Sequence, residues 1–142
     1  MALKNENNIN VQHVHTFRKA EHICLKRDID ALFDKGNAAK TAYPLRAIWR
    51  MLPYEAGPVV KVLVSVSKRH FKHAVDRNRA KRQMREAYRL NKQILSTPEG
   101  LALHVAFIWL SDMPLPSEQV HKKMKALLKS INLKINDSAE VD

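Results

Sequence analysis

Residues 68–92 read KRHFKHAVDRNRAKRQMREAYRLNK and contain ten of the 25 Lys and Arg residues of this 142-residue chain. Placed at about 100° per residue, the positions of this stretch separate onto two faces of a helix. The cationic face holds Lys81, Lys92, Arg85, Asn78, Arg89 and Arg82. The apolar face holds Leu90, Ile94, Ala87, Ala80, Met84, Leu95 and Tyr88. The pattern predicts a helix over about 76–95 that packs on a core with one face and presents cations to an anion with the other.

The cationic face lowers the stability of the helix that carries it. Arg77 and Arg79 lie near the positive end of the helix dipole, where cations are unfavourable. Like charges three or four positions apart add a few tenths of a kcal/mol each, roughly 1–3 kcal/mol in total at low salt. Asp76 and Glu86 offset only part of this repulsion. A helix that only faced water normally interleaves both signs of charge, so a polyphosphate partner explains the pattern better.

The composition of the whole chain agrees with an anionic partner. The formal net charge is +11 and the pI is about 10.0, which favours nucleic acid or an acidic membrane surface. The longest apolar run, residues 101–110, is too short to span a bilayer, and no apolar segment typical of a secretory signal begins the chain. Cys24 is alone, which suits a reducing compartment. We therefore expect a cytoplasmic protein with no membrane partner.

The chain divides into one predicted domain and two tails. Residues 1–15 are Asn-rich and aperiodic and predict a flexible tail, residues 16–134 form a single domain, and residues 135–142 form a polar tail. Within the domain, periodicity predicts a helix over about 26–35, strands over 43–52 and 60–66, and a last helix from Ser117. The apolar run over 101–110 predicts a buried strand. Together with the basic helix, this order predicts a small α/β sandwich with one strand–helix–strand unit.

The order of residues within the basic stretch narrows the range of possible anionic partners. It runs Arg77-Asn78-Arg79-Ala80-Lys81-Arg82-Gln83-Met84-Arg85-Glu86, preceded by Val66-Ser67-Lys68. This segment resembles the signature of the protein subunit of bacterial ribonuclease P, which has Arg-Asn-Arg followed by x-Lys-Arg-x-x-Arg-Glu. Phe17-Arg18 and Phe33-x-x-Gly36 are similar to the N-terminal part of that family, and the resemblance covers about residues 16–132.

The resemblance implies a fold and separate roles for the protein and for a catalytic RNA. The family fold is an α+β sandwich with three helices, a sheet of about four strands and an unusual left-handed βαβ crossover. In the family, the catalytic RNA hydrolyses precursor tRNA with Mg²⁺, and the protein binds that RNA and the 5′ leader of the precursor. The implied partners are therefore the catalytic RNA subunit and precursor tRNA. The polypeptide alone is expected to be inactive and to have no metal site of its own, with Mg²⁺ held mainly by the RNA and the substrate.

Two sets of site residues follow from the resemblance. The expected contacts to the RNA subunit are Lys68, Arg69, Lys72, Arg77, Asn78, Arg79, Lys81, Arg82, Arg85 and Arg89. The expected contacts to the leader are Phe17, Arg18, Ile29, Phe33, Tyr43, Arg46, Ser65 and Ser67. In the first set, cations neutralise backbone phosphates. In the second, exposed aromatic rings stack on single-strand bases without demanding a sequence.

Several alternatives stay open at this point. Ile29 replaces a Phe that many relatives have, and His22 replaces a common Arg. Phe33 and Trp49 have spacings that also suit core packing. The main competing function is a general RNA-binding or ribosome-associated protein without an enzymatic assembly. A DNA-binding basic helix needs a dimerising heptad repeat after it, but the chain breaks at Thr97-Pro98, so DNA is not expected as a partner.

Overall fold

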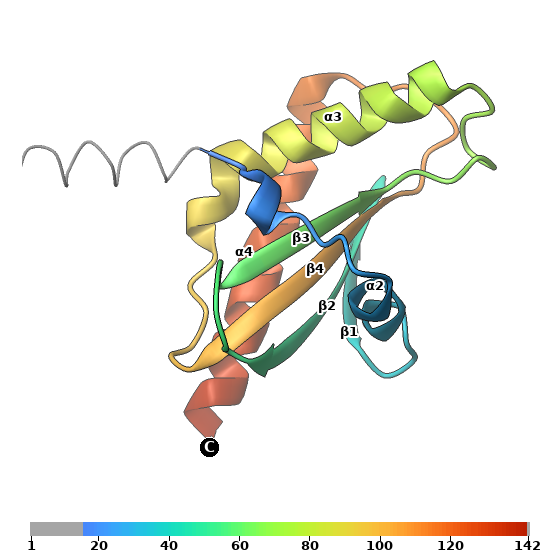
Figure 1. Cartoon of the computed structure of the whole chain (residues 1–142). Coiled ribbons are helices and arrows are strands. Elements are labelled where there is room, and N and C mark those ends of the chain that lie inside the picture. Colours follow the sequence, from blue (N-terminus) through green and yellow to red (C-terminus); the bar gives the residue numbers. More distant parts are fainter. Residues whose placement is uncertain (1–15, 142) are drawn as a thin grey trace, which may run out of the picture.

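The computed structural model describes residues 16–141, so the predicted N-terminal tail over residues 1–15 lies outside the described residues. Its elements along the chain are η1 (Lys19–Glu21), α2 (Lys26–Leu32), β1 (Ala38–Ala42), β2 (Leu45–Pro53), β3 (Val60–Ser65), α3 (Ala74–Asn91), η2 (Lys92–Ile94), β4 (Leu101–Trp109) and α4 (Ser117–Val141). Figure 1 shows how they are arranged. The predicted α+β class is confirmed, with α2, α3 and α4 as its three α-helices.

The four strands form one mixed sheet in the order β1-β2-β4-β3. β2 is antiparallel to both of its neighbours, and β3 is parallel to β4. Because β3 and β4 are adjacent and parallel, the chain must cross from one end of the sheet to the other between them. Helix α3 makes this crossing, so the basic stretch lies within the strand–helix–strand unit that the sequence predicts.

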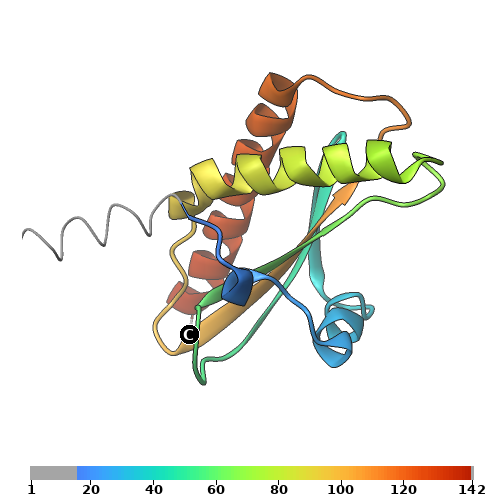
Figure 2. The same ribbon diagram turned by 45° about the horizontal axis from the view of Figure 1, so that its top comes forward.

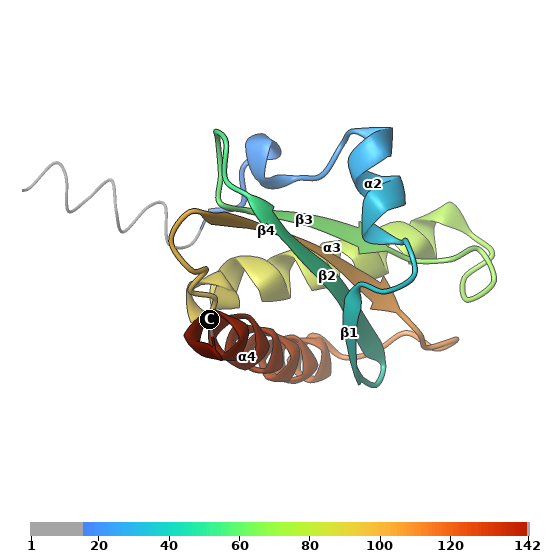
Figure 3. The same cartoon turned by 90° about the horizontal axis from the view of Figure 1, so that it is seen from below.

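The helices lie on opposite sides of the sheet. Figure 3 shows α2 on one side, and α3 and α4 on the other. Figure 2 shows that α3 and α4 cross each other on their side of the sheet. The long pair of helices therefore covers one face of the sheet, whereas α2, with only seven residues, covers part of the opposite face.

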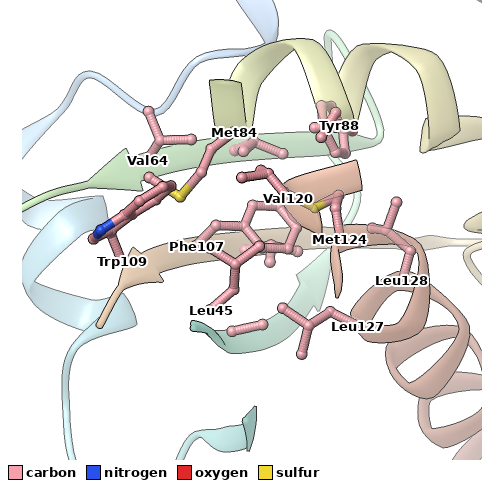
Figure 4. Close-up of a cluster of buried hydrophobic side chains, with 14 of the residues drawn as sticks. Leu45, Val64, Met84, Tyr88, Phe107, Trp109, Val120, Met124, Leu127 and Leu128 are labelled. Atoms are coloured by element: carbon pink, nitrogen blue, oxygen red, sulfur yellow. The ribbon is translucent and has the colours of Figure 1, made fainter. Parts of the chain in front are cut away.

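The main core lies between the sheet and the α3–α4 pair. Alternate residues of β2 and β4 point into it, and Met84 and Tyr88 of α3 meet Met124 of α4 there (Figure 4). The last helix packs on this core through one apolar stripe whose members are all fully buried: Val120, Met124, Leu127, Leu128 and Ile131. Burial at about 25 cal/mol per Å² of apolar surface makes this core the main source of stability.

A smaller core lies on the other face of the sheet. Leu32 and Ile29 of α2 pack there against Ile48, Leu63 and Ala106, which come from three neighbouring strands. The end of α2 is held by the side chain of a later residue: the amide of Asn37 donates to the carbonyl oxygens of Ala31 and Leu32, both at 2.8 Å. These contacts fix the short helix across the middle of this face.

Several predicted boundaries differ from the structure. Helix α2 ends at Leu32 rather than near residue 35, and α3 begins at Ala74 and gives way to the 3₁₀ turn η2 after Asn91. The predicted strand over 43–52 begins at Leu45, and β1 before it has no counterpart in the prediction. The segment Ala38–Ala42 contains no large apolar side chain, so only its pairing with β2 identifies it as a strand.

The C-terminal boundary is also corrected. The polar tail was predicted to begin at residue 135, but α4 continues to Val141. Ile135 is 1% exposed and belongs to the main core. One further turn is anchored by Asn136, whose amide donates to the carbonyl oxygen of Ser96 at 3.1 Å. The prediction was wrong here because Ile135 is a single apolar residue among polar neighbours, and the sequence gives no sign that it continues the buried stripe of α4.

Candidate nucleic-acid interface

Helix α3 presents its cations to solvent because its opposite face is anchored in the core. Ala80, Met84, Ala87 and Tyr88 are all buried, and their spacing fixes the rotation of the helix about its axis. On the outward face Asn78, Arg79, Arg82 and Arg85 are exposed, and Lys81 is half-buried. Among residues 16–141, no carboxylate forms an ion pair with Arg79, Arg82 or Arg85. Leu90, which the helical wheel places on the apolar face, is 37% exposed.

Arg77 has a structural role in addition to its charge. Its Nη1 donates to the carbonyl oxygens of Phe71 and Lys72 at 2.8 and 2.9 Å. Because Phe71 is buried in the main core, these bonds fix the loop that leads from β3 into α3. That loop carries Lys68, Arg69 and Lys72 on its exposed side. Arg77 therefore positions the predicted loop cations beside the basic face of the helix.

The loop is held at two further points. The backbone N–H of Arg69 donates to the hydroxyl of Ser67 at 3.1 Å. His70 Nδ1 lies 2.7 Å from a carboxylate oxygen of Asp112, which follows β4. Ser67, predicted as a leader contact, thus takes part in the turn itself. The loop joins the end of β3 to the basic helix in a defined conformation.

Two cations near the end of the basic helix are paired with carboxylates. Arg89 Nε donates to Glu86 at 3.0 Å, and this bond lowers the pKa of the Glu86 carboxyl. Lys92 Nζ lies 2.7 Å from Glu21 of η1, and both side chains are mostly buried. The pair between Lys92 and Glu21 ties the N-terminal segment to α3. The cationic face with unpaired charges is therefore shorter than the helical wheel predicts and centres on residues 78–85.

A hollow of about 190 Å³ lies between the N-terminal segment, the edge of β3 and the basic helix. It is lined by Phe17, His22, Ile23, Cys24, Val62, Leu63, Val64 and Arg85. The rings of Phe17 and His22 are stacked, with their centroids 4.0 Å apart and 11° between their planes. Burial foremost, and then the charge of Arg85, lower the pKa of His22, which favours the neutral ring. The hollow brings a predicted leader residue, Phe17, next to a signature arginine.

The other predicted leader residues lie elsewhere. Arg18 lines a larger hollow of about 590 Å³ beside Val59, Val60 and the end of α3. Arg46 and Ser65 both pair with Ile108 and so share one row across the sheet on the α2 side. Ile29 packs in the smaller core, while Phe33 and Tyr43 are 42% and 63% exposed. The structure therefore separates Phe17 and Arg18 from the group around α2. Trp49 is buried at 3% exposure, as expected for core packing.

Neither a metal-binding cluster nor a membrane-spanning helix is present among the described residues. In the described part of the chain, no three His, Cys, Asp or Glu side chains are grouped so that they could hold a metal ion. Among the same residues, no helix has the length and apolar character needed to cross a membrane. The site consists of cations, aromatic rings and backbone, which is the chemistry of phosphate and base recognition.

A four-stranded sheet with a crossover helix that exposes a cluster of unpaired cations defines a small α+β nucleic-acid-binding protein. The comparisons with known proteins give the family. The model of the family described as Ribonuclease P matches residues 17–132. This chain therefore belongs to the ribonuclease P protein family, and the resemblance of its signature is confirmed.

Relatives and solved structures agree with this assignment. The chain is 36% identical over 124 residues to the ribonuclease P protein component of Porphyromonas gingivalis, covering 85% of this chain and 90% of that one. It is 37% identical over 134 residues to that of Chlorobium phaeobacteroides, covering 85% and 91%. The fold is similar to the RNase P protein from Thermotoga maritima, with a TM-score of 0.61 at 21% identity, covering 78% of this chain and 96% of that chain. The RNase P protein of Staphylococcus aureus gives 0.61 at 22%, covering 80% and 96%.

Proposed function

We propose that this chain is the protein subunit of a ribonuclease P ribonucleoprotein. It binds the catalytic RNA through the exposed cations of α3 and the loop before it, and it binds the 5′ leader of precursor tRNA. The observation that carries the proposal is the unpaired signature face, with Arg79, Arg82 and Arg85 directed away from the core. Family membership gives no support to the alternative of a general RNA-binding protein without an enzymatic assembly.

In this proposal the protein supplies no catalytic group. Phosphodiester hydrolysis by a protein requires a metal cluster or a positioned acid and base. Within residues 16–141 no group of acidic or metal-binding side chains fits Mg²⁺, and Glu86 beside the basic face is engaged with Arg89. We propose that Mg²⁺ is held mainly by the RNA and the substrate. The protein contributes by neutralising phosphates where RNA strands approach each other. The cytoplasm is the proposed location, since precursor tRNA is the substrate.

Reconstitution tests the proposed function directly. Adding the purified full chain to its matching catalytic RNA is expected to lower the Mg²⁺ concentration needed for half-maximal cleavage of precursor tRNA, because bound cations replace part of the metal's role in charge neutralisation. Cleavage is followed by release of the labelled leader. The chain without the RNA is expected to give no cleavage. An unchanged Mg²⁺ requirement contradicts the proposal.

The leader contact is tested at Phe33, whose ring is 42% exposed at the end of α2. Phe33→Ala is expected to weaken binding of leader-bearing precursor to the holoenzyme by about 1–3 kcal/mol, the range for loss of one stacked base. Binding of mature tRNA, which has no leader, should be unchanged. Phe33→Trp is the matched control because it keeps an aromatic surface. An equal loss on both RNAs removes Phe33 from the leader site.

A further inference from the structure

Three basic side chains form a row across the sheet on the side that carries α2. His104 of β4 pairs directly with Arg50 of β2 and with Lys61 of β3. Residues opposite each other in neighbouring strands project to the same face. Ile48 and Leu63, two positions along from Arg50 and Lys61, belong to the core under α2. The row Arg50–His104–Lys61 therefore lies on the same face as α2, one step beyond the residues that the helix covers.

This row is unfavourable for the folded protein by itself. The side chain of His104 is 6% exposed, and its Nδ1 has no hydrogen-bond partner within the described residues. A buried polar atom without a partner destabilises a fold. Arg50 and Lys61 lie on the two strands that flank β4, roughly 10 Å apart at about 4.8 Å per strand, and their like charges repel each other across His104. In the described part of the chain, neither Arg50 nor Lys61 forms an ion pair with a carboxylate.

The charges around His104 show that the row Arg50–His104–Lys61 has too little negative charge to balance its cations. Burial foremost lowers the pKa of His104, and Lys61 and Arg50 lower it further. Asp28 of α2 acts in the opposite direction, but its own ion pair is with Arg27 at 3.8 Å. Two fixed cations thus face one carboxylate and an imidazole whose lowered pKa favours its neutral form. An added anion between the two cations would relieve their repulsion and favour the protonated imidazole.

We propose that Arg50, His104 and Lys61 form a binding site for a phosphate group of an RNA strand. The site is separate from the Arg46–Ser65 row: four residues along each strand separate the two rows, roughly 13 Å at 3.3 Å per residue. The core under α2 lies between them. Because α2 covers the row between them, an RNA strand that contacts both rows passes over α2. The proposal depends on the proposed function only for the identity of that RNA.

Two sources of the phosphate are distinguished by binding measurements at about 0.1 M salt. The double variant Arg50→Gln/Lys61→Gln is expected to weaken binding about 5- to 60-fold, the loss of one or two phosphate contacts. If only leader-bearing precursor binds the holoenzyme less tightly, the phosphate is in the leader. If the catalytic RNA alone binds less tightly to the protein, the phosphate is in the RNA subunit. Unchanged binding of precursor, mature tRNA and catalytic RNA overturns the proposal.

The same sheet supplies a matched control. Lys40 of β1 is exposed and pairs with Ala47, so it projects to the opposite face. Lys40→Gln is expected to leave all three affinities unchanged. His104→Leu separates binding from folding, because it removes the unpartnered buried nitrogen. Its thermal midpoint is expected to equal or exceed that of the original chain while its RNA affinity falls. Retained affinity in this variant removes His104 from the site.

A second readout does not depend on ribonuclease P activity. Imidazole NMR signals of the full chain are titrated with pH, with and without a short single-stranded oligoribonucleotide. The bound phosphate is expected to raise the pKa of His104, so proton uptake accompanies binding and affinity rises as the pH falls from 7.5 toward 6. The shift should vanish in Arg50→Gln/Lys61→Gln. An unmoved His104 overturns the site. A shifted His104 in a protein that fails to assist precursor cleavage leaves the site standing and rejects the proposed function.

Discussion

Replacing Arg79 and Arg82 together by alanine is expected to weaken binding of the catalytic RNA about 25- to 60-fold near 0.1 M salt. Each phosphate contact contributes roughly 0.7–0.9 to the slope of log K against log salt, and the loss of two contacts gives this range. Both side chains are exposed on the outward face of α3. The slope itself should become shallower by about 1.4–1.8, measured by filter binding between 0.05 and 0.5 M salt.

The matched control for this variant lies on α4. Lys125 and Lys129 are exposed there, and Lys125→Ala/Lys129→Ala removes the same two charges from the net charge of +11. We expect a much smaller change in the salt slope for this control, since general attraction to RNA depends on total charge but counterion release depends on contacts. Equal slopes for the two double variants would mean that α3 has no privileged contact with the RNA.

Arg77 is unsuitable for the same experiment, although it belongs to the same signature. Its two bonds to the carbonyl oxygens of Phe71 and Lys72 fix the loop before α3. Removing Arg77 therefore changes the position of several cations as well as one charge. A hydrogen bond to a charged group contributes about 1.5–3 kcal/mol, so loss of affinity in such a variant mixes folding with binding. The structure thus distinguishes Arg77, which positions the loop, from Arg79 and Arg82, whose side chains are exposed, within a motif that is continuous in sequence.

The sequence predicts the basic face well because a helix has a local period. Ala80, Met84 and Ala87 are buried as their spacing indicates, and Arg82 and Arg85 face outward. Pairing with distant segments follows no such period. Lys92 is assigned to the cationic face by its angle, yet it pairs with Glu21, 71 residues earlier in the chain. The rotation of a helix is therefore predictable from sequence, whereas the neutralisation of its charges requires the fold.

For the sheet too, some features are predictable from the sequence and others are not. Alternation predicts β3 and an apolar run predicts β4, while alternate residues of β2 such as Leu45 and Ala47 are buried. The register between strands is absent from each strand's own sequence. His104 meets Arg50 and Lys61 only because three strands align at one row. The fold also places Phe17 and Arg85 in the lining of one hollow. The sequence assigns Phe17 to the leader and Arg85 to the RNA subunit. Sites that combine elements are therefore the part that sequence reasoning misses.

The C-terminal end of α4 yields the largest expected change in stability. Ile135→Ala is expected to lower the free energy of unfolding by about 2–5 kcal/mol, because it deletes a side chain that is 1% exposed and leaves a cavity in the main core. The surrounding turn cannot easily collapse onto the gap. Asn132 accepts a bond from the backbone N–H of Ser96 at 2.8 Å, and Asn136 donates to the carbonyl oxygen of the same residue.

Leu133 provides the control within the same turn. Its side chain is 65% exposed, so Leu133→Ala should change the free energy of unfolding by no more than about 0.5 kcal/mol. Both variants are measured by urea denaturation with fluorescence and circular dichroism, and the midpoint of each transition is compared at a fixed slope. A domain that ended at residue 134 would give equal, small effects for the two positions. A large loss confined to Ile135 places the last turns of α4 inside the folded domain, where they support the layer that also contains α3.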